Sequence, residues 1–181
     1  MRHVRCIAAC LLFLAASCNA APQAIDRSIA HTPAGDVKLT ARVVDGARII
    51  PPATEQQLTA RSSALEKVTS DQLVIVTLPT LRGAKIEQVG LALGRGWGVG
   101  RHDIDNGVIL LVAPNEHKVR VEVGYGLERL LSDDRAGKIV RDMLPLFRAN
   151  EPAQAISLGE TEIIQVLESD KLRPQYLRKA A

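Results

Sequence analysis

A run of seven residues without a polar side chain, GVILLVA at 107–113, is the feature that most constrains the fold. A strand of this composition needs cover on both faces, and the centre of a sheet that lies between two layers provides it. The segment QLVIVTL at 72–78 is similarly apolar on both faces. The two segments therefore predict neighbouring central strands in a sheet with helices on both sides.

The segment after the first run predicts a hairpin. KVRVEVG at 118–124 alternates valines with Lys118, Arg120 and Glu122, and the four residues PNEH separate it from the apolar run. Such a short connection is typical of antiparallel strands. Since one face of the second strand is polar, we expect it to lie nearer the sheet edge.

Apolar residues at helical spacing predict four helices, and a short extended segment at 41–52 precedes them. Thr54 and Gln57 have the spacing of a capping box for the first helix, and Ser132 or Asp133 can cap the third. The residues on the apolar faces are Leu58, Leu65 and Val68; Ile86, Val89, Leu93 and Trp97; Ala136, Ile139, Val140, Met143, Leu144 and Phe147; and Ile156, Ile163 and Leu167. The order of elements predicts an α/β fold, a three-layer α/β/α sandwich with a central mixed sheet that contains an antiparallel hairpin.

The first twenty residues have the pattern of an export signal. Arg2 and Arg5 precede the apolar run 7–16, which is too short to span a bilayer. LAASC at 14–18 is similar to a lipobox, in which Cys18 would be lipidated and become the mature N-terminus. A cut after Ala20 is the alternative. Both predict an exported, periplasmic protein, and the first predicts attachment to a membrane through Cys18.

The remaining chain divides into three parts. We expect a flexible tether over 21–40, one domain over 41–170 and a basic tail over 171–181. Without the signal the chain has 21 basic and 20 acidic residues, and its aromatic content is 3%, which argues against nucleic-acid binding. No second apolar segment is long enough to cross a membrane, so the lipid anchor is the one expected membrane contact. We expect a monomer.

Three familiar motifs are incomplete. GRGWGVG at 94–100 follows a helix and lacks the spacing of a dinucleotide-binding loop, so a flexible helix exit is the simpler interpretation. DIDNG at 103–107 would begin a calcium-binding EF-hand loop, but Pro114 occupies the position of the required glutamate. AISLG at 155–159 lies in a helical pattern, unlike a serine nucleophile elbow.

Acidic side chains gather at the ends of the predicted elements. Asp45 ends the first extended segment, Asp105 and Asn106 precede the central hairpin, and Asp133 and Asp134 open the third helix. Each position also suits an ordinary turn or a helix N-cap. If these ends met at one edge of the sheet, their oxygens would suit a hard divalent cation.

Four motifs resemble the TPM domain over residues 43–168. They are VVDGARIIPP, QLVIVTLPTLRG, LGRGWGVG followed by DNGVILLVAP, and KVRVEVGYGLERLLSDDRAGKIVRDMLPLFR. The resemblance implies an α/β/α sandwich, and in some members calcium or another divalent cation binds at an acidic sheet edge. It implies Asp45, Asp105 and Asp133 as the recurring acids. Asn106 joins them as a further ligand, Glu128 and Arg120 lie beside the site, and Asp103 and Asp134 are additional acids that are not typical of the family.

Three functions follow from these expectations. The first is a lipid-anchored accessory domain of the cell envelope that binds a divalent, calcium-like cation and contacts an envelope or membrane protein. The second is a metal-assisted acid phosphatase, as in a thylakoid-lumen member of the family, although the sequence offers no convincing nucleophile. The third is an interaction domain that needs no metal.

Overall fold

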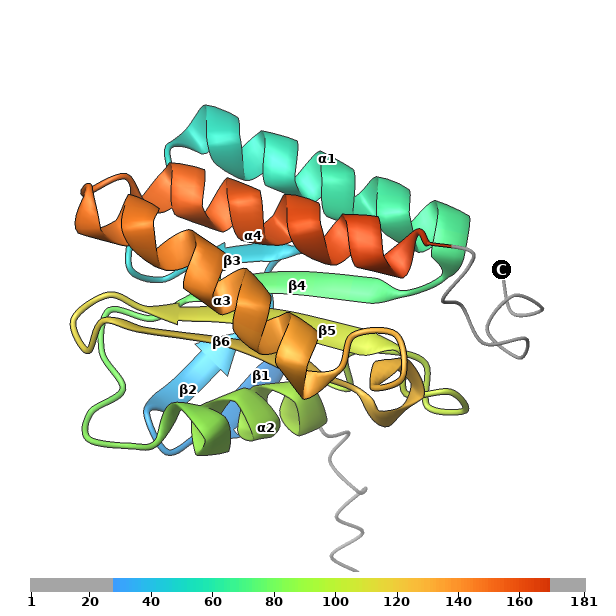
Figure 1. Ribbon diagram of the computed structural model, residues 1–181. Helices are drawn as coiled ribbons and strands as arrows, with labels where there is room; N and C mark the ends of the chain where they lie inside the picture. The colour runs from blue at the N-terminus through green and yellow to red at the C-terminus, as the bar shows by residue number, and fades with distance from the viewer. Residues whose placement is uncertain (1–27, 170–181) are drawn as a thin grey trace, which may run out of the picture.

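A four-stranded mixed sheet forms the centre of the computed structural model, which describes residues 28–169 (Figure 1). The strands follow the order β3-β4-β5-β6 across the sheet. β3 to β5 are parallel, and β6 is antiparallel to β5. Their bounds are Val43–Asp45 for β3, Gln72–Thr77 for β4, Gly107–Ala113 for β5 and Lys118–Val123 for β6. The predicted mixed sheet and its antiparallel hairpin are confirmed, with β6 at the edge.

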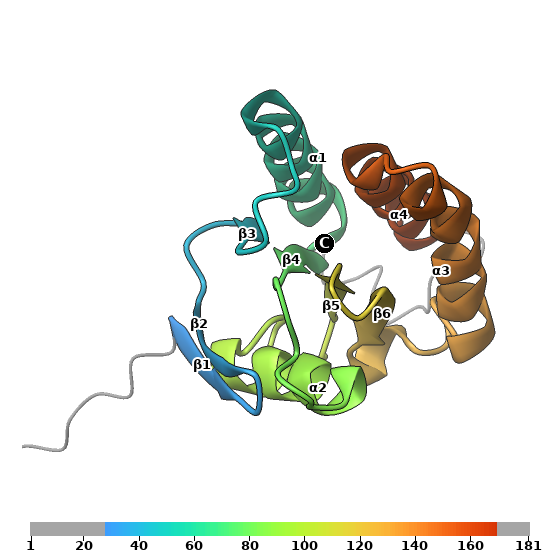
Figure 2. The same cartoon turned by 90° about the vertical axis from the view of Figure 1, so that its left-hand side faces the viewer.

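Helices cover both faces of this sheet. α1 (Pro52–Thr69), α3 (Asp133–Arg148) and α4 (Pro152–Leu167) lie on one side, and α2 (Ile86–Trp97) lies on the other (Figures 1 and 2). A short 3₁₀ helix, η1 (Tyr125–Leu127), connects β6 to α3. The three-layer α/β/α sandwich is therefore confirmed.

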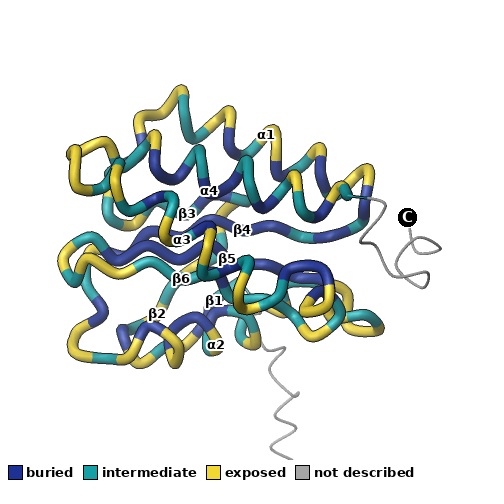
Figure 3. Tube along the Cα trace, in the orientation of Figure 1, coloured by how far each residue is buried: buried dark blue, intermediate teal, exposed yellow. Residues whose placement is uncertain are grey.

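The central strands divide their side chains between two cores. Leu73 and Ile75 of β4 belong to the core under α1, α3 and α4, while Val74 and Val76 belong to the core with α2. All seven residues of β5 are buried, as Figure 3 shows along the middle of the molecule. Burying one such aliphatic side chain contributes roughly 1.5–3 kcal/mol, which explains why the apolar runs determine the position of these strands.

Two helix starts differ from the predicted caps. α1 begins at Pro52, before Thr54, and no side chain caps it. Proline fits the first turn because its missing N–H is one that a helix leaves unpaired. α3 begins at Asp133 after Ser132, and the Ser132 hydroxyl makes no capping hydrogen bond.

The prediction of a flexible tether is wrong for residues 29–38. β1 (Ile29–Thr32) and β2 (Gly35–Lys38) form an antiparallel hairpin beside α2. Ala30 is fully buried, and Nε1 of Trp97 donates a hydrogen bond to the carbonyl of Val37 at 3.1 Å. The hairpin extends the α2 layer and covers an apolar surface of α2, a tertiary contact that four-residue strands do not signal locally.

Some predictions fall outside this structure. The export signal, Cys18 and the basic tail over 171–181 lie outside the described residues. Between residues 28 and 169, no helix has both the length and the apolar character that a membrane crossing requires.

Candidate functional site

Strand direction separates the acids that were predicted to converge. Asp45 pairs with Thr77 at the end of β4, whereas Gly107, just after Asp105 and Asn106, pairs with Gln72 at its start. These positions are five residue steps apart along β4, a distance of about 16 Å. Ligands of one calcium ion lie about 2.4 Å from it. Asp45 and Asp105 therefore cannot bind the same ion in this fold.

The carboxylate of Asp45 holds the turn that follows β3. It accepts hydrogen bonds from the backbone N–H groups of Ile49 at 3.2 Å and Ile50 at 2.9 Å. The hydroxyl of Thr77 also donates to it, at 2.5 Å. These contacts connect the β3–α1 turn to β4, so a structural role accounts for Asp45.

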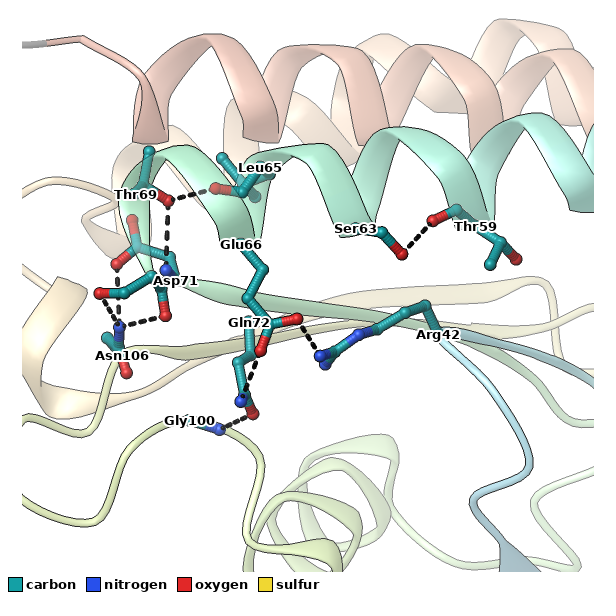
Figure 4. A network of polar contacts seen from close by, with 11 residues as sticks. Arg42, Thr59, Ser63, Leu65, Glu66, Thr69, Asp71, Gln72, Gly100 and Asn106 are labelled. Carbon is teal, nitrogen blue, oxygen red and sulfur yellow. Dashed lines mark hydrogen bonds and ion pairs between the residues drawn. The ribbon is translucent and has the colours of Figure 1, made fainter. Parts of the chain in front are cut away.

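Asn106 is a fully buried connector between two loops. Its Oδ1 accepts a hydrogen bond from the N–H of Arg101 at 2.8 Å. Its Nδ2 donates to the carbonyl of Ser70 at 2.8 Å and to Oδ1 of Asp71 at 3.1 Å (Figure 4). Because both sides of the amide make hydrogen bonds, Asn106 fastens the loop before β5 to the α1–β4 turn, and this structural role accounts for its burial.

A second set of polar contacts fastens the same loop from the other side (Figure 4). The N–H of Gly100 donates to Oε1 of Gln72 at 2.8 Å, and Nε2 of Gln72 donates to Oε1 of Glu66 at 2.9 Å. Glu66 also pairs with Arg42, which precedes β3. The loop 98–106 is therefore held by β4 and by the α1–β4 turn, and α1 supports it through the contact of Glu66 with Gln72.

The other predicted site residues lie in separate places. Asp103 is exposed and pairs with Arg101 within its own loop. Asp133 and Arg120 line a cavity of about 380 Å³ beside the first turn of α2, and Nε of Arg120 donates to Glu122 at 2.6 Å. Asp134 is exposed in the first turn of α3.

The predicted acids therefore do not fit a single metal ion. In the described part of the chain, no three His, Cys, Asp or Glu side chains form a group that could hold one. The expected convergence of Asp45, Asp105 and Asp133 is wrong. Parallel pairing places the end of β3 and the start of β5 at opposite ends of the strands, and Asp133 lines a different cavity from Asp105. Ion binding itself stays a prediction.

Two of the predicted residues, Asp105 and Glu128, do share a cavity. They line a cleft of about 620 Å³ between α2, the loop 98–107, the end of β6 and η1, which we call the α2–η1 cleft. Ile109, Val99 and Val123 add apolar surface to its lining. Volumes of this size are typical of ligand and peptide pockets.

Close packing of backbones fixes one wall of the cleft. A Cβ atom added to Gly126 would overlap the carbonyl oxygen of Ile104, and one added to Gly124 would overlap that of Asp105. The N–H of Gly126 donates to the carbonyl of Asp105 at 3.2 Å. The loop 98–107 therefore lies directly on the β6–η1 connection, where only glycine leaves room.

Asp105 is held in an unusual backbone conformation. Its φ is +47°, a left-handed value that costs a non-glycine residue about 1 kcal/mol. Its N–H donates to the carbonyl of Arg101 at 2.7 Å, which closes the turn and places the exposed residue in the lining of the cleft.

Residues that the sequence interpretation missed complete the cleft. Leu91 and Arg95 come from α2, His102 from the loop, and Tyr125 from η1. Tyr125 and Leu91 are large apolar side chains with exposed fractions of 77% and 41%. The sequence contains a signal for Leu91. It is an apolar residue of the helix that lies outside the buried face formed by Val89, Leu93 and Trp97.

Comparisons with known proteins agree with this architecture. The family model of the TPM domain matches residues 43–166. The N-terminal domain of a protein from P. gingivalis, solved by NMR, is 34% identical over 74% of this chain and 85% of its own, with a TM-score of 0.68. The N-terminal domain of the cg2496 protein from Corynebacterium glutamicum is 13% identical over 75% of this chain and 87% of its own, with a TM-score of 0.57, a likeness of fold. No curated protein matches the chain.

Proposed function

The chain belongs to the TPM domain family, and from this premise we propose that it is an exported, lipid-anchored accessory domain of the cell envelope that binds a partner protein at the α2–η1 cleft. The single observation that carries the proposal is the exposure of Tyr125 and Leu91 at this cleft. Exposed aromatic and aliphatic side chains beside a cavity are typical anchors of protein–protein contacts.

The N-terminal sequence supports the location. Arg2, Arg5 and the apolar run 7–16 have the pattern of an export signal, and LAASC provides Cys18 for lipidation. Mass spectrometry of the mature N-terminus tests this part. A diacylglycerol-modified Cys18 is the expected result, and a mature chain that begins at Ala21 would replace the lipid anchor with a soluble exported form.

Crosslinking in the intact envelope tests partner binding. A photoreactive residue at position 125 should give an adduct of defined mass, which Leu91→Asp should abolish. The same residue at position 68 is the matched control, because Val68 is also an exposed apolar side chain, 64% accessible, and lies on α1. Equal adducts at both positions, or none at 125, would contradict the proposal.

An acid phosphatase is the second candidate, because Arg95 and His102 line the cleft with Asp105. Arginine can bind a phosphate group, and histidine can transfer a proton. Turnover of p-nitrophenyl phosphate that remains with the chain through purification and disappears in Asp105→Asn would favour this candidate. Asparagine tolerates the left-handed backbone of residue 105, so loss of folding would not explain the result.

A further inference from the structure

The charges of the α2–η1 cleft limit which partner can bind there. The lining includes three carboxylates, from Asp105, Glu122 and Glu128. Glu122 is already neutralised by Arg120. Within residues 28–169, no hydrogen bond or ion pair is found for the side-chain carboxylates of Asp105 and Glu128. These two groups therefore keep their charge available to a ligand.

The positive groups of the lining come from other elements. Arg95 lies on α2, and His102 lies on the loop that precedes Asp105. Arg95 offsets one of the two available carboxylates, so the arginine and these two carboxylates together carry one net negative charge. The cleft thus has an arginine on its α2 wall and carboxylates on its loop and η1 walls.

Tyr125 adds a second preference for a cation. It is 77% exposed, and it lines the cleft three residues before Glu128. The face of a tyrosine ring attracts ammonium and guanidinium groups. The stem of a lysine or arginine would also contact the ring and the side chain of Leu91.

On the basis of the proposed partner binding, we propose that the α2–η1 cleft recognises a partner segment in which a lysine or arginine lies next to an apolar residue. The cation pairs with Asp105 and Glu128 beside Tyr125, and the apolar neighbour packs on Leu91 and Val99. Recognition is therefore both electrostatic and apolar.

An NMR titration of the exported chain with three blocked peptides tests this inference. The first is GALKLRAG, the second replaces its Lys and Arg with Gln, and the third replaces its leucines with Ser. The first should shift the amides around Leu91, Asp105 and Tyr125, and each of the other two should bind at least tenfold more weakly. Raising the salt concentration should weaken the first peptide because the ion pairs are exposed.

A double variant, Asp105→Asn with Glu128→Gln, provides the matched protein. It keeps the shape of both side chains, and it should reduce the affinity of the cationic peptide to that of the Gln peptide. Equal binding of the cationic and Gln peptides would overturn the inference and leave partner binding at the cleft intact. A crosslink at position 125 without binding of the cationic peptide would also overturn the inference and leave partner binding at the cleft intact. Absence of both the crosslink and peptide binding would overturn the proposed function as well.

Discussion

Asp105 and Asn106 are adjacent in the sequence but have different surroundings. Asn106 is buried and uses its whole amide to join two loops, while Asp105 is exposed in the cleft on a left-handed backbone. Asp45 resembles Asn106 in this respect, because its carboxylate is used by a turn and by Thr77. A polar residue at the end of a strand can therefore hold the fold or face a ligand, and its hydrogen bonds distinguish the two roles.

Asn106→Asp separates these roles experimentally. The new carboxylate would replace a donor that faces Oδ1 of Asp71 and the carbonyl of Ser70. We expect the free energy of unfolding to fall by about 3 kcal/mol, since a buried charge would lack a partner. Urea denaturation with and without calcium measures this, and Asp103→Asn in the same loop is the exposed control. Restoration of stability by calcium would instead indicate that residue 106 binds metal.

Glu160 on α4 predicts a pH dependence of stability. Burial against α1 raises the pKa of its carboxyl from 4.5 to about 7, although Arg61 and Ser62 oppose the shift. The folded state therefore holds a proton that the unfolded state releases, so this contribution is complete below pH 4.5 and is lost as the pH rises to about 7. The loss is at most about 3 kcal/mol.

Glu160→Gln should remove this contribution to the pH dependence of stability. Its amide can keep the contact with Ser62 without a charge, so the difference in unfolding free energy between pH 5 and pH 8 should become smaller than in the wild type. Chemical denaturation at both pH values measures the difference. If the variant and the wild type show the same pH dependence of stability, other groups cause it. Glu162 is one such group, because burial also raises its pKa.

At the scale of elements, the β1–β2 hairpin and α2 depend on each other. A Cβ atom at Gly96 would collide with Ala30, so the helix and the hairpin are in backbone contact. Trp97, at the end of α2, is 5% exposed and bonds to β2. Because α2 also forms a wall of the cleft, the hairpin supports the candidate site from outside the matched family region.

A chain that begins at residue 41 tests this dependence. Loss of the hairpin should lower the melting temperature by several degrees, since apolar surface of α2 would become exposed. The fluorescence of Trp97, the one tryptophan of the sequence, should shift to longer wavelength. A chain that begins at residue 28 is the control. Identical melting curves for the two chains would support the original tether interpretation.

At the scale of the whole molecule, the apolar runs predicted most of the architecture. GVILLVA and QLVIVTL could be placed at the centre because every residue needs cover, and the alternation of KVRVEVG placed β6 at the edge. The β1–β2 hairpin was missed because its strands are too short to show a period.

The candidate site was harder to predict because it depends on strand direction. When a helix connects two parallel strands, the end of the first strand and the start of the second lie at opposite ends of the strands in the sheet. That rule already separates Asp45 from Asp105 once β3 to β5 are parallel. The spacing of residues in the sequence could not predict that Asp105, Glu128 and Tyr125 line one cleft. Backbone contacts at glycines bring these distant segments together.

The most direct test of this account is a calcium titration of the exported chain, followed by NMR at the amides of Asp45, Asp105 and Asp133. We expect that these three amides do not share one saturable response, because the residues line three different cavities and the carboxylate of Asp45 is held by Ile49, Ile50 and Thr77. A single binding curve common to all three amides would contradict it.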